Sequence, residues 1–407
     1  MSACSEKQIE QQLVPDKIWN SMFISIFIAN MALNLGQQMS NPLLAAYADS
    51  LGAPASQIGI LMSMFAITSL LCKIVTSPAM DTYNRKYMVV LSTAILATAY
   101  LGYSFSNEMP FLMLFRLLQG CASAFANVCC LALVSEALPA NKFGTGMGYY
   151  SLAQVISQAI GPTIGLIMVS LFGYSMTYAV NAIVMLVALL LTSRIRYNFK
   201  RTKKLSITIN NIIAKEAILP ASLIFFMGVG FSTINAFLIV YAGKQGIQTG
   251  IGLFFTVYAL TLLFTRPLIG KLTDKFGLFK VSVPAIIFTG ISFFIISFSK
   301  SLPLFLVAAF INAFGYGACQ PALQSLAMKS VPNERRGSGS STNYIGQDLG
   351  SLVGPTCAGF FAQTIGYTSM WRIMITPLVI GLIILIAFKG KITRIEENFR
   401  KKSNVAQ

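Results

Sequence analysis

Apolar residues occur in runs of about 20 that hold hardly any charge, and short polar stretches separate the runs. A helix of that length rises about 30 Å, which matches the hydrocarbon core of a bilayer. The runs therefore predict an all-α integral membrane protein with twelve transmembrane helices. The predicted helices cover residues 20–46, 57–76, 86–105, 109–134, 144–170, 175–194, 216–242, 249–270, 279–299, 302–328, 339–363 and 370–387.

Composition and charge agree with this pattern, because 55% of the residues are hydrophobic and only 11% are charged. The formal charge is +17, and the basic residues gather in the loops after even-numbered helices and in the C-terminal tail. The positive-inside rule then places both termini in the cytoplasm. We expect a multi-pass protein of the plasma membrane, a bacterial inner membrane, with no removable signal peptide. Basic residues that lie between apolar runs also argue against a nucleic-acid partner.

The two halves of the sequence resemble each other. A constant shift of 193 positions aligns Gly59 with Gly252, Lys73 with Arg266, Asp81 with Asp274, Gly161 with Gly354 and Pro162 with Pro355. The predicted divisions are a tail over 1–16, a six-helix bundle over 17–194, a basic linker over 195–215, a second bundle over 216–389 and a basic tail over 390–407. Each half crosses the membrane an even number of times, so the halves share one orientation. Transporters that rock two bundles around a midplane site are built in this way, and we expect a functional monomer.

The loop after the eighth predicted helix carries glycines and charges at a characteristic spacing: Gly270, Asp274, Lys275, Gly277 and Lys280. This loop resembles the cytoplasmic signature of the major facilitator superfamily, and the loop after the second helix keeps Asp81, Arg85 and Lys86 of it. The resemblance implies the major facilitator fold and a cytoplasmic gate, in which each Asp faces the positive end of a helix in the opposite bundle. Lys73 and Arg266, one turn further inside, are gate candidates or side chains that snorkel to the interface.

Two more patterns resemble signatures of this superfamily. Arg116 and Gly120 fit an Arg-x-x-x-Gly pattern, about 10 Å along the fourth helix. A charge at that depth costs at least about 2.5 kcal/mol, so Arg116 is a functional candidate, with snorkelling as the alternative. The fifth and eleventh helices share a glycine-proline motif that the family associates with antiporters and that also suits simple helix packing. Its residues are Gly148, Gly161, Pro162, Gly165, Gly350, Gly354 and Pro355.

Polar side chains recur at helical spacing on the first, fourth, seventh and tenth helices, which line the central cavity in this superfamily. Such residues are costly in lipid and must face protein or water. We interpret them as a substrate path, and hydrogen bonds between helices are the alternative. The candidates are Asn30, Asn34, Gln37, Gln38, Asn41, Arg116, Gln119, Ser123, Asn127, Ser232, Asn235, Asn312, Tyr316, Gln320 and Gln324.

Asp348 is a carboxylate deep in the eleventh helix, about 13 Å from its start. Burial favours the neutral form of a carboxyl group, whereas a basic partner opposes this effect. The sequence leaves proton coupling and structural pairing equally open. Asp348 and Arg116 both lack a charged residue at the matching repeat position, so we take them as candidates for proton coupling.

Other chemistry finds little support in the sequence. Histidine is absent, the seven cysteines lack the spacing of metal sites, and no phosphate-binding Gly-x-x-x-x-Gly-Lys-Ser/Thr loop occurs. We therefore expect no enzyme, no metal and no cofactor.

These observations favour a secondary active transporter that exports small molecules in exchange for protons by rocker-switch alternating access, resembling the twelve-helix drug/proton antiporter group. The alternatives are uptake of a metabolite or sugar by symport or uniport, and a membrane sensor that has lost transport. The candidate cavity carries Arg116 but no midplane carboxylate on its lining helices, so we expect neutral or anionic substrates over lipophilic cations.

Overall fold

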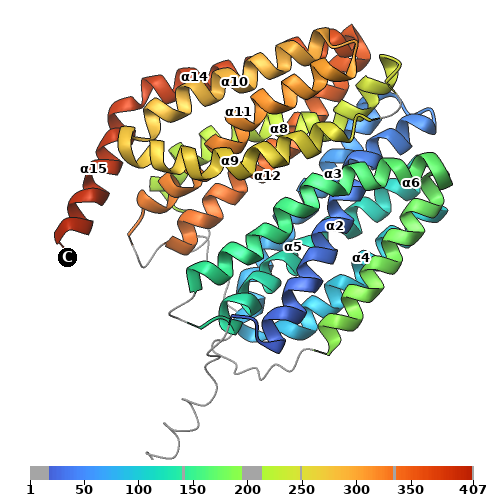
Figure 1. The fold of residues 1–407 in the computed structure, drawn as a ribbon, viewed down its shortest axis with the longest axis horizontal. Coiled ribbons are helices and arrows are strands. Elements are labelled where there is room, and N and C mark those ends of the chain that lie inside the picture. Colours follow the sequence, from blue (N-terminus) through green and yellow to red (C-terminus); the bar gives the residue numbers. More distant parts are fainter. Residues whose placement is uncertain (1–17, 140–142, 195–212, 248–249, 333–335, 406–407) are drawn as a thin grey trace, which may run out of the picture.

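The computed structural model describes residues 18–139, 143–194, 213–247, 250–332 and 336–405, which fold into long helices without a β-strand (Figure 1). The first half of the chain forms α2 (Ser21–Ser50), α3 (Ala55–Thr82), α4 (Arg85–Phe105), α5 (Met109–Ala137) and α6 (Phe143–Ser193). The second half forms the short 3₁₀ helix η2 (Lys215–Ala217), α8 (Ile218–Lys244), α9 (Leu253–Phe276), α10 (Leu278–Phe298), α11 (Leu302–Lys329), α12 (Arg336–Ile365), α13 (Tyr367–Ile373), α14 (Thr376–Ala387) and α15 (Lys389–Val405). The all-α prediction is confirmed.

Nine helical stretches in the described part of the chain are long and apolar enough to cross a membrane. One of them, 45 residues long within α6, turns back at Gly173 and so supplies two crossings. The φ of Gly173 is 75°, a backbone conformation that glycine adopts without steric cost. Helices α2 and α12 are also long enough, but their polar residues keep them out of this apolar set. With these two helices included, each of the twelve predicted spans occurs as helix.

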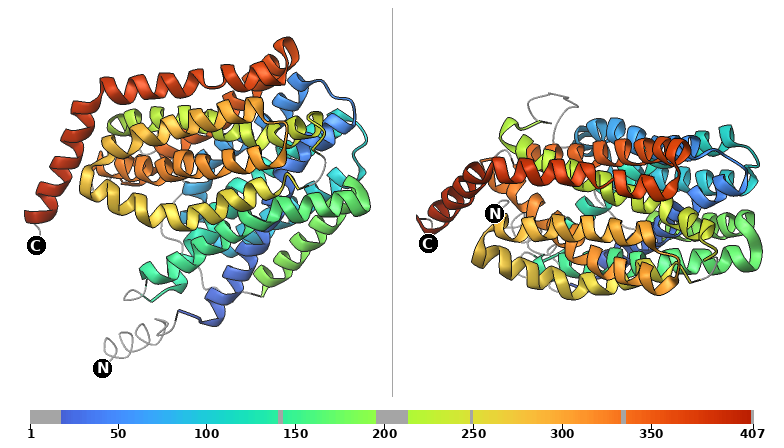
Figure 2. Two further views of the ribbon diagram at one scale, coloured as in Figure 1. Left: turned by 45° about the horizontal axis from the view of Figure 1, so that its top comes forward. Right: turned by 90° about the horizontal axis from the view of Figure 1, so that it is seen from above.

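Successive helices run in opposite directions, which gives the molecule two ends. We call the end at which α6 stops at Ser193 and α8 begins at Ile218 the linker end, and the end at which α2 stops at Ser50 the far end. In the first half, α6 packs on α2 and α4, and α5 packs on α3 and α4. In the second half, α12 packs on α8, and α11 packs on α9 and α10. Most of the contact between the halves comes from two helix pairs, α3 with α12 and α6 with α9 (Figure 2).

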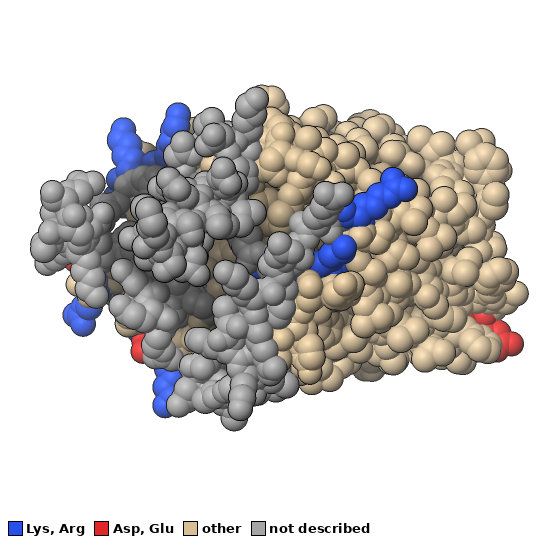
Figure 3. Space-filling view, turned by 90° about the horizontal axis from the view of Figure 1, so that it is seen from below, with Lys and Arg blue, Asp and Glu red and all other residues tan. Residues whose placement is uncertain are grey.

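The outer surface suits a lipid environment. Large apolar side chains such as Phe264 and Leu171 are 77% and 67% exposed. Figure 3 shows a broad uncharged surface on the flank of the molecule, with most of the Lys and Arg side chains at one end. Charge is therefore segregated from the belt that the apolar helices form, as expected for a protein whose middle lies in hydrocarbon.

The C-terminal part of the chain differs in two details from the sequence prediction. The twelfth span is divided into α13 and α14, because the helix breaks at Met374 and Ile375 just before Pro377. Residues 390–405, expected only as part of a basic tail, belong to α15, which extends beyond the end of α14 (Figure 1). Ile392 is fully buried and holds the start of α15 against the bundle.

Candidate functional site

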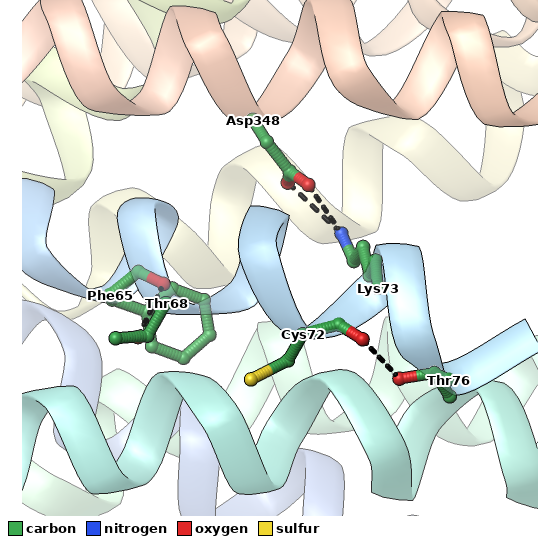
Figure 4. Close-up of polar contacts among 6 residues, drawn as sticks. All are labelled: Phe65, Thr68, Cys72, Lys73, Thr76 and Asp348. Carbon is green, nitrogen blue, oxygen red and sulfur yellow. Dashed lines mark hydrogen bonds and ion pairs between the residues drawn. The ribbon is translucent and has the colours of Figure 1, made fainter. Parts of the chain in front are cut away.

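Lys73 of α3 and Asp348 of α12 form an ion pair between the two halves of the chain (Figure 4). The Lys73 Nζ lies 2.7 Å from Oδ2 and 3.0 Å from Oδ1 of Asp348. The two side chains keep 30% and 14% of their surface exposed, so the pair lies where the packed interior meets accessible space. The Nζ also lies 5.5 Å from the centre of the Tyr344 ring, one turn before Asp348 on α12. Two residues that the sequence singled out separately are thus direct partners.

Between this ion pair and the far end, α3 and α12 meet backbone to backbone. A Cβ on Gly59 would collide with the carbonyl oxygen of Pro355. The Ser63 hydroxyl donates to the Leu352 carbonyl oxygen at 2.7 Å and accepts from the Thr356 hydroxyl at 2.8 Å. The interface therefore depends on small and hydroxyl-bearing residues, which let helix backbones approach closely.

The α6–α9 pair repeats this arrangement. A Cβ on Gly252 would lie 2.8 Å from the Thr163 Cα. The Thr256 hydroxyl donates to the Ala159 carbonyl oxygen at 2.6 Å and lies 3.1 Å from the Thr163 hydroxyl. Each of these four residues stands 193 positions from its counterpart in the α3–α12 interface. The sequence repeat is thus also a repeat of contacts between the halves.

Further links between the halves lie at the far end. The Lys244 Nζ of α8 and the Asp49 Oδ1 of α2 are 3.2 Å apart. The backbone N–H of Ser56 donates to the Gln363 side chain, also at 3.2 Å. Among the residues described in full, the polar contacts that we find between the halves lie at the far end or between the far end and the Lys73–Asp348 pair. The halves are therefore joined at the far end in this conformation.

Arg116 of α5 is buried, with 3% of its surface exposed, and its contacts among the described residues lie in the first half. Its Nη1 donates to Asn41 Oδ1 at 2.9 Å and to Gln119 Oε1 at 2.7 Å. The guanidinium carbon lies 4.9 Å from the centre of the Phe65 ring, and Nη2 lies 4.0 Å from the Met62 sulfur. Within the described part of the chain no carboxylate contacts it, and its Nε has no hydrogen-bond partner. Such burial argues against snorkelling.

Gln119 connects Arg116 to two tyrosines that are not among the candidates predicted from the sequence. The Tyr103 hydroxyl donates to Gln119 Oε1 at 2.8 Å, and Gln119 Nε2 donates to the Tyr100 hydroxyl at 3.2 Å. Both tyrosines are fully buried. Their repeat positions hold Phe293 and Ile296. The loss of repeat symmetry that marked Arg116 could therefore have identified them too.

The remaining candidates of the first half form shorter links. Gln37 Nε2 donates to the Ser123 hydroxyl at 2.7 Å, which joins α2 to α5. Asn34 Nδ2 donates to Asn30 Oδ1 at 2.9 Å within α2. Asn127 lies on the same face of α5 as Ser123 and is exposed. Some of these side chains therefore form hydrogen bonds within the first half. Such bonds were the predicted alternative to a substrate path.

In the second half an aromatic pair takes the place of the polar network. Phe231 of α8 and Tyr316 of α11 stack with ring centres 4.3 Å apart and planes 6° apart. Asn235 Nδ2 donates to the Phe231 carbonyl oxygen at 3.0 Å. Asn312, one turn before Tyr316, is 1% exposed, and its Oδ1 has no partner. The two halves thus offer different chemistry at related positions.

Three more candidates of the second half lie nearer the linker end or on α8. Gln320 is half-buried on α11. Gln324 Nε2 approaches the Tyr344 hydroxyl at 3.4 Å, next to the Lys73–Asp348 pair. The Ser232 hydroxyl donates to the Gly350 carbonyl oxygen at 3.2 Å and so joins α8 to α12.

The glycine-proline motif lies where α6 meets α2 and where α12 meets α8. A Cβ on Gly161 would lie 2.8 Å from the Cβ of Gln38, and one on Gly350 would lie 2.5 Å from the Phe225 carbonyl oxygen. The other motif residues with described surroundings are Gly165, Gly354, Pro162 and Pro355, which lie in the same helices. The surroundings of Gly148 are outside the described part. The motif glycines seen here pack helices of the same half together, whereas Pro355 lies against Gly59 of the other half.

The two signature loops lie at the linker end. The side chains of Asp81 and Asp274 are outside the described part of the chain, so their contacts with the opposite half stay a prediction. Gly277 has a φ of 84° and joins α9 to α10, and the Leu278 N–H donates to Glu396 of α15 at 3.0 Å. The other gate candidates occupy helix ends or the last turns of α9: Arg85 and Lys86 begin α4, and Gly270 and Lys275 lie in α9.

Two repeated groups of long helices that share one orientation and meet across the molecule are the architecture of many secondary transporters. Residues 26–248 and 220–405 both match the model of the Major Facilitator Superfamily, and the chain belongs to this family. An MFS-type transporter of Methanocaldococcus jannaschii is 24% identical over 381 residues, which cover 90% of this chain and 98% of that protein. A homologue of the multi-drug resistance efflux pump PmrA from Lactococcus lactis is 26% identical over 343 residues, 80% of this chain and 84% of the pump. Among solved structures, a POT family transporter in complex with 5-aminolevulinic acid has a TM-score of 0.80 at 15% identity and covers 94% of this chain and 99% of its own.

Proposed function

We propose that this protein exports small molecules from the cytoplasm in exchange for protons. Similarity to the PmrA-type efflux pump supports export, because that relative matches along most of both chains. The linker end, which carries most of the basic loop residues, faces the cytoplasm in this proposal. The far-end contacts then close the outer side, and the conformation seen is one that opens inward.

The observation that carries the proposal is the Lys73–Asp348 ion pair across the two halves. A rocker-switch motion that separates α3 from α12 must break this pair. Protonation of Asp348 would remove its charge and so weaken the link, which couples proton binding to the motion. Arg116 has no acidic contact among the described residues and acts in this proposal as a fixed positive charge of the substrate path.

Transport by everted membrane vesicles of an expressing bacterium tests this proposal. Untargeted comparison of metabolites in cells with and without the protein selects the substrate, and export predicts lower cellular levels in expressing cells. Vesicles energised by respiration should then release protons when that substrate is added. Asp348→Asn should abolish this proton release, whereas Glu108→Gln, an exposed carboxylate at the far end, should leave it unchanged.

Three results would count against the proposal. Accumulation of the substrate in expressing cells would support uptake. Substrate movement that is independent of the proton gradient would support uniport or another coupling ion. Unchanged proton release in Asp348→Asn vesicles would remove Asp348 from the coupling step.

A further inference from the structure

Arg266 occupies the repeat position of Lys73 but has no counterpart of Asp348. The shift of 193 positions that aligns Lys73 with Arg266 aligns Asp348 with Val155 of α6. Val155 is apolar and buried. The α6–α9 interface therefore carries the basic member of an ion pair, but Val155 stands where the acidic member would be. The hydroxyl contacts of the two interfaces do match.

Arg266 is unpaired in the part of the chain that the structure describes. Its guanidinium takes part in none of the ion pairs there, and its Nε is buried without a hydrogen-bond partner. The residue lies seven positions before Thr273, where the apolar span of α9 ends, which is about 10 Å along the helix. An unpaired charge at such depth is costly and marks a functional position by default.

An aromatic cluster lies further along α9 and on its partner helices, and Phe231 is its partly exposed member. The stacked Phe231 and Tyr316 rings are joined by Tyr258 of α9, whose ring centre is 6.1 Å from that of Phe231. Tyr258 stands eight residues before Arg266 on α9, about 12 Å along the helix, so that a substrate with two fused rings can span this distance. The unpartnered Oδ1 of Asn312 adds a hydrogen-bond acceptor one turn away from Tyr316. Flat rings contact aromatic side chains well, and a guanidinium binds carboxylate or sulfonate through paired hydrogen bonds.

We propose that Arg266 binds the anionic group of an aromatic substrate, with the ring of the substrate against Phe231, the partly exposed member of the aromatic cluster. The anionic group of the substrate takes the place that Asp348 has in the other interface. This inference rests on the proposed transport function, because it names the substrate class: aromatic carboxylates and sulfonates. Such a substrate forms an ion pair with the second half while it is bound.

Binding to the full chain in lipid nanodiscs tests the inference, with 2-naphthoate and its neutral counterpart 2-naphthamide as probes in calorimetric titrations. The unmodified protein should bind the anion at least ten times more tightly than the amide. Arg266→Gln should remove this preference, and Arg266→Lys should keep part of it. Val155→Asp should also remove it, because the new carboxylate would pair with Arg266. Lys271→Gln, an exposed basic residue of the same helix, should bind as the unmodified protein does.

Equal affinity of the unmodified protein for the two probes would overturn the inference, as would a preference for the anion that survives in Arg266→Gln. If Arg266→Gln and Arg266→Lys both lost the same affinity for the two probes, Arg266 would have only a structural role, and this result would also overturn the inference. These titrations need no proton gradient. Anion-selective binding without proton-linked transport would therefore refute the proposed function and leave this inference intact.

Discussion

The Lys73–Asp348 pair shows how a charge inside a membrane protein depends on its partner. Lys73→Met would leave the Asp348 carboxylate, only 14% exposed, without the group that binds both of its oxygens. We expect a loss of about 1–3 kcal/mol, below the value for a fully buried pair because Lys73 keeps 30% of its surface exposed. The loss should appear as a lower melting temperature of the purified protein in detergent.

Two comparisons make that measurement decisive. Lys300→Met, which removes an exposed lysine at the far end, should leave the melting temperature nearly unchanged. A second change, Asp348→Asn, introduced into Lys73→Met should recover part of the loss because it removes the uncompensated charge. If Lys73→Met melts at the same temperature as Lys300→Met, the ion pair contributes nothing measurable to stability.

The sequence predicted which charged residues to examine but not how they pair. Lys73 and Asp348 each stood out as a charge in an apolar run, yet they are 275 positions apart. Their pairing depends on the register between two helices from different halves, which hydropathy does not encode. The polar surroundings of Arg116 could be predicted in part from the sequence. Asn41 and Gln119 were among the predicted candidates, whereas Tyr100 and Tyr103 were not.

Among the helices, close approach of α3 and α12 depends on Gly59. Gly59→Val would place side-chain atoms against the Pro355 carbonyl oxygen, so the two helices must separate on the far-end side of the ion pair. We expect a melting temperature lower by several degrees, at roughly 2–4 °C per kcal/mol. Gly243→Val is the matched control, because nothing lies within 4 Å of a Cβ at that position. Equal melting temperatures of the two variants would show that the interface tolerates a larger spacing.

The last helix, α15, is held against the bundle by the carboxylate of Glu396 in addition to the buried Ile392. Glu396 accepts the Leu278 N–H at the N-terminal end of α10, where a negative charge is favourable. Glu396→Ala should cost about 0.5–2 kcal/mol of local stability and expose α15 to limited proteolysis. Glu397→Ala, one residue further along and exposed, should be cut at the rate of the unmodified protein. Equal cleavage rates for both variants would mean that Glu396 does not hold the helix in place.

The helices themselves were predictable because a run of apolar residues is sufficient to define each span. The exceptions have physical causes. α2 and α12 carry the polar residues and glycines of the site and so fall outside the most apolar set, although the sequence pattern still revealed them. The break between α13 and α14 and the helical state of α15 were not predicted, since both depend on packing at the end of the bundle.

For the whole molecule, the internal repeat explains the symmetry of the structure and also its asymmetry. Hydroxyl contacts recur at equivalent positions in both interfaces between the halves. The charges do not recur, because Asp348 corresponds to Val155. The α3–α12 interface therefore contains both members of its ion pair, whereas the α6–α9 interface leaves Arg266 available to a ligand. A repeat in sequence predicts where the halves meet, and its exceptions indicate where the two interfaces differ in function.

Alternating access requires these interfaces to open, and paired cysteines can test this directly. The hydroxyl oxygens of Ser63 and Thr356 are 2.8 Å apart, and those of Thr163 and Thr256 are 3.1 Å apart. In a background without native cysteines, a disulfide formed at either cysteine pair should fix the far end in its closed state. We expect transport to fall by more than 90% on oxidation and to return on reduction, with substrate flux measured before and after each treatment.

A third cysteine pair distinguishes the effect of locking the far end from any effect of the oxidant itself. The hydroxyl oxygens of Ser104 in α4 and Ser175 in α6 are 3.2 Å apart, but both residues belong to the first half. A disulfide there leaves the two halves free to move relative to each other, so transport should continue at nearly its full rate. Because the three cysteine pairs start from similar distances, they should form with similar ease. Full transport by protein cross-linked between α3 and α12 would mean that this interface stays closed throughout the cycle, and the motion would then have to occur elsewhere in the molecule.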